Sequence, residues 1–127
     1  MEKLKNLSMN SNFKILSKCQ KVIEYYNRLL VNFPGKETVL KQNIERAMYD
    51  MVECLYAYNI NQTERIKEKY LKDFIVKLSM IDFYSNISFD KRIISQRQLE
   101  ILGRNLLEIK KMSYAIMKNM NYAQDGL

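Results

Sequence analysis

The chain has 127 residues, of which 47% are hydrophobic and 28% charged, and this composition excludes a disordered chain and suits a single domain with its own core. Only three Gly and one Pro are present, which argues against a turn-rich β fold. The net charge of +7 is uneven, with +4 on residues 1–28, −1 on residues 29–90, +5 on residues 91–118 and −1 on residues 119–127, so the excess belongs to the two terminal helices.

The first predicted helix follows an N-terminal segment, residues 1–12, that we expect to be loose. Over residues 15–33, apolar side chains recur at alternating steps of three and four, which is the spacing of a packed helix seam. Pro34 and Gly35 end this helix, because Pro has no amide to donate and disfavours helix in the residue before it. The seam residues are Ile15, Cys19, Val22, Tyr26, Leu29 and Phe33.

The second and third predicted helices show the same spacing over residues 40–58 and 70–85. A short polar segment, residues 59–63, separates them. We expect the side-chain oxygen of Thr63 or Asn61 to cap the start of the third helix.

The fourth predicted helix covers residues 99–116. Ser95 and Gln98 form a capping box before it: the serine hydroxyl accepts a bond from a first-turn amide, and the glutamine side chain returns to the amide of the cap residue. Residues 120–127 follow the helix, and we expect them to be loose.

Connections of about three to eight residues join the four predicted helices, and connections this short make consecutive helices antiparallel neighbours. The sequence therefore predicts an all-α fold, an antiparallel up-down-up-down four-helix bundle over residues 13–119. The first and fourth helices are neighbours in such a bundle, so their charges act on the same side of the molecule.

Two cysteines and no histidine narrow the chemistry that the chain can perform. Cys19 and Cys54 each fall on an apolar seam position, so we expect free thiols that pack as small apolar side chains. Without histidine, the chain lacks the usual general base and the commonest metal ligand, and two separated cysteines cannot form a zinc site. We expect no catalytic site, no cofactor and no metal.

Basic side chains form a line along each terminal helix. Most of them repeat every seven residues, which is about two helical turns, so each set lies on one side of its helix. On neighbouring helices the two lines form one broad basic surface, suited to nucleic acid or to an acidic partner. The alternative is ordinary solvated surface, because both lines fall outside the apolar seam. The candidate nucleic-acid contacts on these two helices are Lys14, Lys18, Lys21, Arg28, Arg97, Arg104, Lys111 and Lys118.

Three tyrosines lie off the apolar seams. Tyr49 and Tyr56 repeat at seven residues on the outer side of the second helix, and Tyr25 lies off the seam of the first. Exposed tyrosine is a favoured contact residue, because it is large, stiff and half polar. These residues predict an oligomer or partner interface, with packing against two neighbouring helices as the alternative for the wide apolar stripes beside them.

No apolar run approaches the roughly 20 residues needed to cross a membrane. The N-terminal segment contains lysines but neither an apolar stretch nor a cleavage pattern, so it does not resemble a secretion signal. We therefore expect a cytoplasmic protein without a membrane partner.

Three segments carry a resemblance to a known family. Residues 33–44 read Phe-Pro-Gly-Lys-Glu-Thr-Val-Leu-Lys-Gln-Asn-Ile, and residues 94–99 read Ile-Ser-Gln-Arg-Gln-Leu. Residues 107–112 read Leu-Glu-Ile-Lys-Lys-Met. Over residues 13–119 the chain resembles the four-helix-bundle family that includes the accessory variability determinant of diversity-generating retroelements. The same family includes proteins encoded in intervening sequences of bacterial 23S rRNA genes.

This resemblance implies a homopentamer, a barrel of five subunits around a central pore, with no catalytic site of its own. It also implies two partners, a reverse transcriptase and its template RNA, which the protein binds to support mutagenic cDNA synthesis. Lys111 matches the basic position of the fourth-helix motif, and Lys77 matches a basic position common in the third helix. Many members carry arginines where residues 82–86 read Asp-Phe-Tyr-Ser-Asn, so the terminal helices are the better candidates for nucleic-acid contact.

Two functions remain open at this point. The first is a non-catalytic accessory protein that binds RNA or DNA through the basic surface. The second is a protein–protein scaffold, of the rRNA-insert type or an orphan, that docks through its outer tyrosines and binds no nucleic acid. An enzyme is disfavoured, because the sequence contains neither a nucleophile with a histidine base nor a phosphate-binding glycine loop.

Overall fold

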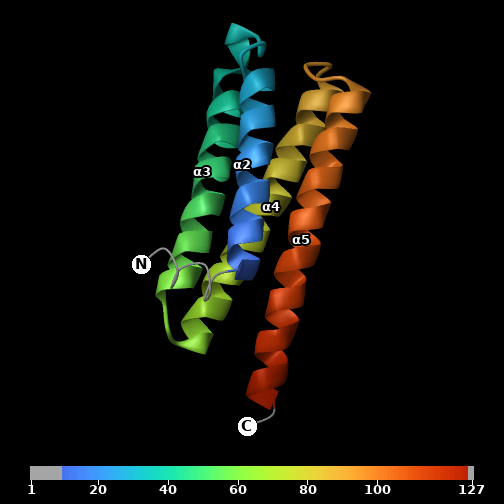
Figure 1. Ribbon diagram of the computed structural model, residues 1–127. Coiled ribbons are helices and arrows are strands. Elements are labelled where there is room, and N and C mark those ends of the chain that lie inside the picture. The colour runs from blue at the N-terminus through green and yellow to red at the C-terminus, as the bar shows by residue number, and fades with distance from the viewer. Residues whose placement is uncertain (1–9, 126–127) are drawn as a thin grey trace.

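The computed structural model describes the backbone of residues 10–125 and the side chains of residues 14–120. This part of the chain contains four α-helices, one short 3-10 helix and no strand. The elements are α2 (Asn10–Leu30), η1 (Gly35–Glu37), α3 (Thr38–Ile60), α4 (Glu64–Asp90) and α5 (Gln96–Asp125) (Figure 1). The predicted all-α class is confirmed, and the four helices are consistent with a four-helix bundle.

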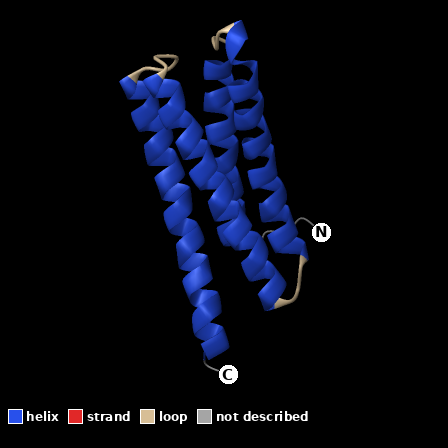
Figure 2. Ribbon diagram, turned by 180° about the vertical axis from the view of Figure 1, so that it is seen from behind, coloured by secondary structure: helices blue, strands red, loops and turns tan. Residues whose placement is uncertain are grey.

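The four helices lie alongside one another. The connections 31–37 and 91–95 are at one end of the molecule, and the connection 61–63 is at the other (Figure 1, Figure 2). Each helix packs against the next one in sequence, and α5 also packs against α2. The first and last helices are therefore neighbours, which places the two predicted basic lines on adjacent helices.

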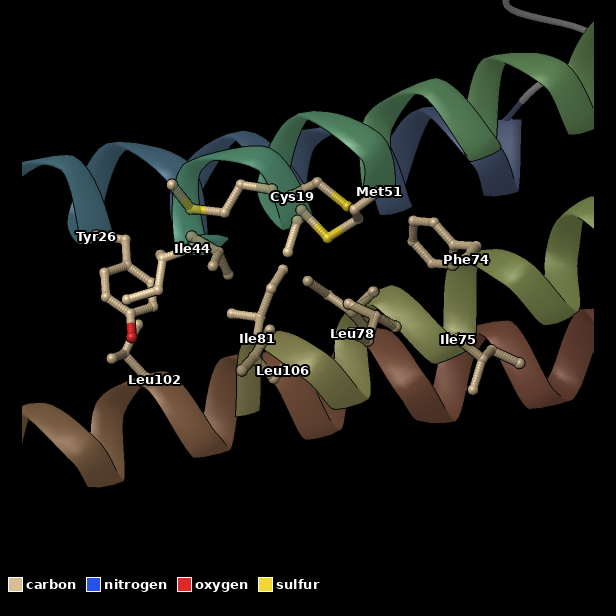
Figure 3. Close-up of a cluster of buried hydrophobic side chains, with 14 of the residues drawn as sticks. Cys19, Tyr26, Ile44, Met51, Phe74, Ile75, Leu78, Ile81, Leu102 and Leu106 are labelled. Atoms are coloured by element: carbon tan, nitrogen blue, oxygen red, sulfur yellow. The ribbon is translucent and has the colours of Figure 1, made fainter. Parts of the chain in front are cut away.

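The core receives apolar side chains from all four helices. Figure 3 shows Cys19 and Tyr26 of α2 in one interior with Met51 of α3, Leu78 of α4 and Leu102 of α5. These five side chains are almost completely buried. Burying an apolar side chain of this size stabilises the fold by about 1.5–3 kcal/mol, so the seam residues predicted from the spacing dominate the stability.

Three serines are buried among these apolar residues, and each has a hydrogen-bond acceptor within its own helix. Ser85 donates to the carbonyl of Ile81 at 2.7 Å, and Ser113 donates to the carbonyl of Ile109 at 2.9 Å. Ser88 donates to the carbonyl of Tyr84, one turn earlier in α4, at 2.8 Å. These bonds explain how a hydroxyl occupies an apolar seam without the cost of an unsatisfied polar group.

The helix ends agree with the prediction at one capping site and differ at another. At α5, the amide of Ser95 donates to Gln98 Oε1 at 2.8 Å and the amide of Gln98 donates to Ser95 Oγ at 3.1 Å, which confirms the capping box. At α4, Thr63 occupies the N-cap position but its side chain makes no capping bond. The predicted cap by Asn61 is also wrong, because its side-chain amide donates to the carbonyl of Ala57 and so closes the end of α3 instead.

The expected segment boundaries differ from the helix bounds by a few residues. Asn10–Asn12 form the first turn of α2, and the rest of the segment 1–12 that we expected to be loose lies outside the described residues. At the other end, α5 continues to Asp125, beyond the expected limit at residue 119. Met120 is buried, so apolar contact extends one turn past the last seam residue that the spacing predicted.

No helix in the part of the chain that the structure describes combines the length and apolar character needed to span a membrane.

Candidate nucleic-acid interface

The basic line of α5 lies on the outer side of that helix. Its members follow one another at seven residues, and all four are exposed. Leu102, Leu106 and Ile109 are buried, and the basic line lies on the opposite side of the helix from them. This line consists of Arg97, Arg104, Lys111 and Lys118.

The basic residues of α2 lie beside α5. Lys18 Nζ is 2.6 Å from Glu108 Oε1, and this ion pair joins the two helices. Lys18, Lys21, Asn105 and Glu108 line a shallow groove of about 240 Å³ between them. Lys14 is exposed one turn before Lys18. The structure therefore places Lys18 and Lys21 of the first predicted line at the α2–α5 junction, beside the helix that carries the second line.

We call this surface the α2/α5 basic face. It is defined by eight of the nine predicted nucleic-acid contacts, namely Lys14, Lys18, Lys21, Arg28, Arg97, Arg104, Lys111 and Lys118. Within residues 14–120, Lys18 is the only one of these eight that forms an ion pair. Most of the cations on this face therefore form no ion pair in the described structure.

Arg28 contacts an aromatic ring rather than an acid. Its guanidinium carbon lies 5.6 Å from the centroid of the Tyr25 ring, which is cation–π geometry. Tyr25 is half-buried and packs against the core, so this residue, predicted as an interface tyrosine, holds Arg28 at the edge of the basic face.

Lys77, the ninth predicted contact, lies on a different side of the molecule. Lys77 Nζ is 3.6 Å from Asp50 Oδ2, and both side chains are about one-third exposed. This pair joins α4 to α3, whereas the α2/α5 basic face lies along the other two helices. Lys77 therefore does not join the predicted surface in this structure.

Tyr49 and Tyr56 are exposed on α3, with 58% and 52% of their surface accessible. Tyr25 does not lie with them. Tyr25 is seven residues after Lys18, so it lies on the side of α2 that faces α5. Because α5 does not pack against α3, this side of α2 is separate from the surface that carries Tyr49 and Tyr56. The three predicted interface tyrosines are thus divided between two surfaces.

A second group of cations, which the sequence did not predict, lies at one end of the bundle. Lys36, Lys91 and Arg92 come from two connections that are distant in sequence and line one cleft. The basic pair Lys91-Arg92 and the Gly-Lys turn are visible in the sequence, but nothing in the spacing indicates that the two connections meet.

The two thiols are poor nucleophiles in this environment. Burial raises the pKa of Cys19 to about 12, and burial is also the main cause of the raised pKa of Cys54. A protonated thiol neither attacks an electrophile nor binds a metal well. Both cysteines are free, as the sequence predicted. Within the residues that the structure describes, no cluster of three or more Cys, Asp or Glu side chains could hold a metal ion.

Comparisons of the chain with protein-family models, with curated proteins and with solved structures find no match.

Proposed function

We propose that this protein is a non-catalytic accessory protein that binds nucleic acid through the α2/α5 basic face. The observation that carries the proposal is the contrast in charge pairing within the described structure. Seven of the eight cations on this face have no ion-pair partner, whereas three of the five basic residues of α4, Lys69, Lys72 and Lys77, have one.

The spacing of these cations suits a phosphate backbone. Residues seven apart on a helix are about 10 Å apart along its axis, so the α5 line offers a row of charges to a strand that lies along it. Lysine and arginine would contact phosphate oxygens and release condensed counterions, with little selectivity for base sequence. If about six phosphates are neutralised, affinity falls about a thousandfold between roughly 50 and 200 mM salt.

The finer assignment follows from the sequence resemblance. We propose that the chain is an antiparallel up-down-up-down bundle that assembles as a homopentamer and acts in the cytoplasm. Its partners would be the reverse transcriptase and the template RNA of a diversity-generating retroelement. The short connections 31–37, 61–63 and 91–95 support the antiparallel order. The motifs over residues 33–44, 94–99 and 107–112 support the family and its assembly.

The first test is light scattering of the purified protein with and without a short structured RNA, at 50 and 200 mM salt. We expect a particle of about five subunits that gains mass with RNA at low salt and loses that mass at high salt. A particle whose mass is the same with and without RNA at both salt concentrations would contradict nucleic-acid binding. A monomer that still binds RNA would contradict only the pentamer.

A scaffold function is the second candidate, and the exposure of Tyr49 and Tyr56 favours it. A protein partner that docks on these tyrosines would bury their rings against an apolar surface. Reverse transcriptase capture that resists nuclease and is lost in the Tyr49→Ser/Tyr56→Ser double variant would support a scaffold. Capture that disappears with nuclease treatment would support the nucleic-acid function instead.

A further inference from the structure

The two connections at one end of the bundle are joined by an ion pair. Lys91 Nζ is 3.0 Å from Glu37 Oε1 and 3.2 Å from Glu37 Oε2, so the segment after α4 is bound to the segment before α3. Beside this pair is an open cleft of about 480 Å³, whose wall also includes Asn32, Lys36 and Arg92. The cleft exists only because these two connections meet.

Arg92 has a backbone conformation that is unusual for an arginine. Its φ angle is 62°, in the left-handed region, and it is the only non-glycine residue with positive φ in the described backbone. The amide of Arg92 donates to the carbonyl of Phe89 at 2.8 Å, and the amide of Ile93 donates to the carbonyl of Ser88 at 2.8 Å. These two bonds form a Schellman motif, in which the left-handed position is usually glycine. Glycine at this position would avoid the steric strain that an arginine Cβ imposes.

The position of Arg92 gives its side chain access to two hollows. It lines the cleft beside Lys36, and it also lines a second hollow of about 680 Å³ that includes Ser95 and Gln98. In the first cleft, Lys91 already pairs with Glu37. Within the described residues, neither Lys36 nor Arg92 has an acidic partner. The cleft therefore contains two cations whose charge no carboxylate balances.

We propose that this cleft binds a phosphate group, with the Arg92 guanidinium as the planar donor and the Lys36 ammonium as the second charge. Arginine matches phosphate because its parallel N–H groups bond two oxygens at once. The two connections that line the cleft lie at the end of the bundle where α5 begins and α2 ends (Figure 1). A nucleic-acid strand on the α2/α5 basic face would pass Arg97 and reach the cleft, so the inference rests on the proposed function and extends it to a new site.

The test is an amide NMR titration of the whole protein with two separate probes. One probe is inorganic phosphate, and the other is a short single-stranded RNA without a terminal phosphate. We expect saturable shifts of the amides in segments 32–37 and 91–95. Saturation by the RNA alone would identify a phosphodiester as the ligand, and saturation by inorganic phosphate alone would identify a free phosphate. Shifts that neither saturate nor concentrate in these segments with either probe would overturn the proposal.

Variants separate binding from folding. Arg92→Gly should lower affinity for the saturating probe about three- to tenfold while it raises Tm by about 2–4 °C, because glycine removes both the guanidinium and the backbone strain. Lys36→Gln should lower affinity without raising Tm. Arg65→Gln, which removes an exposed arginine from the opposite end of the bundle, should change neither quantity. Unchanged affinity in both Arg92→Gly and Lys36→Gln would refute the site.

The outcomes also distinguish this site from the α2/α5 basic face. RNA binding that depends on Arg104 and Lys111 but not on Arg92 or Lys36 would refute the cleft and leave the proposed function in place. Saturable phosphate binding in the cleft of a protein that binds no RNA would support the cleft and refute the proposed function.

Discussion

The two sides of the bundle differ in how many of their basic side chains form ion pairs. On the α3/α4 side, Lys69, Lys72 and Lys77 each lie within 4 Å of a carboxylate, and those two helices together have nearly balanced charge. On the α2/α5 side, basic side chains outnumber acidic ones, and Lys18–Glu108 is the ion pair that the described residues form there. Within the described residues, three of the seven basic side chains of α3 and α4 form ion pairs, whereas only one of the eight on the α2/α5 basic face does.

This difference shows why charge content alone is a poor guide to a binding surface. α4 contains as many basic residues as α5, but Lys69 and Lys72 form ion pairs with carboxylates one helical turn away, whereas Arg104 of α5 has Glu100 and Glu108 at the same spacing and forms no ion pair with either. Exposed pairs of this kind add little stability, so their main consequence here is to lower the local field. A polyanion would therefore distinguish the two sides by the positions of their acids rather than by the number of their lysines.

The largest expected effect is on RNA affinity. Arg104→Glu combined with Lys111→Glu should weaken binding on the order of a hundredfold at 50 mM salt and reduce its salt dependence, because two phosphate contacts become repulsive. Fluorescence anisotropy with a labelled RNA at several salt concentrations measures both quantities.

The matched control for that variant is Lys69→Glu combined with Lys72→Glu, which reverses two exposed lysines of α4 and gives the same net charge. It should change affinity by no more than about threefold, since these lysines are already paired with acids. Equal losses in the two double variants would mean that binding follows net charge and that the two sides do not differ.

The second effect is a loss of stability at alkaline pH that originates in α2. The folded protein keeps the proton on Cys19, whose pKa is raised to about 12, while the unfolded chain loses it near pH 9. The contribution of this thiol is therefore complete below pH 9 and declines between pH 9 and about 12, at about 1.4 kcal/mol per pH unit. Urea denaturation of the wild type at pH 7, 9 and 10.5 should show the decline.

Cys19→Ala should make this alkaline decline shallower, at the cost of a small cavity that lowers stability equally at every pH. Cys54→Ala is the control on the other side of the bundle, and it should preserve most of the decline because Cys54 is only half-buried. An identical pH profile in wild type and Cys19→Ala would contradict the assignment.

The third effect concerns the hydrogen bond that links the two sides through the core. Tyr26 Oη of α2 is 2.9 Å from Ser85 Oγ of α4, and Ser85 gives its own hydrogen to the carbonyl of Ile81. Tyr26 is therefore the donor. Tyr26→Phe should lower the free energy of unfolding by about 1 kcal/mol, because it removes one buried hydrogen bond without leaving a donor unsatisfied.

Chemical denaturation of Tyr26→Phe beside Tyr56→Phe provides the comparison, since the Tyr56 hydroxyl belongs to an exposed ring. Tyr56→Phe should be neutral within experimental error. Equal losses in both variants would argue against a specific role for the buried bond.

The smallest effect tests charge pairing directly. Lys77→Gln should destabilise the fold by about 0.5 kcal/mol, because Asp50 loses its partner across α3 and α4. Lys111→Gln should be neutral or slightly stabilising, because Lys111 has no carboxylate partner in the described structure. Lysine and glutamine have similar helix propensities, so the two substitutions are matched in that respect. Equal destabilisation by both would remove the contrast between the two sides.

Much of the fold could be predicted because it depends on local rules. The spacing of apolar residues located the buried side chains Tyr26, Met51 and Leu102, since only side chains on one side of a helix can reach a common core. The capping box at Ser95 was equally predictable, because its two hydrogen bonds involve residues three apart. Helix ends without such local partners were less predictable: Asn61 was expected to cap the start of α4, but its side chain closes the end of α3 instead.

The candidate surface could be predicted only in part. The positions of Arg104 and Lys111 on the outside of α5 followed from the seven-residue repeat. The pairing of Lys18 with Glu108 and of Lys77 with Asp50 could not be predicted, because each pair joins two helices whose relative rotation the sequence does not specify. For the same reason, nothing in the sequence placed Tyr25 on a different surface from Tyr49.

The sequence by itself determined that this protein is helical, most of the residues that are buried, and that positive charge accumulates on the terminal helices. These properties depend on composition and on a periodicity of 3.6 residues, both of which are local. Tertiary structure alone decided which cations pair between distant segments, and where two connections meet to form the cleft at Lys36 and Arg92. Ion pairs and clefts depend on distances of a few ångströms between distant segments, and those distances are fixed only when the core packs.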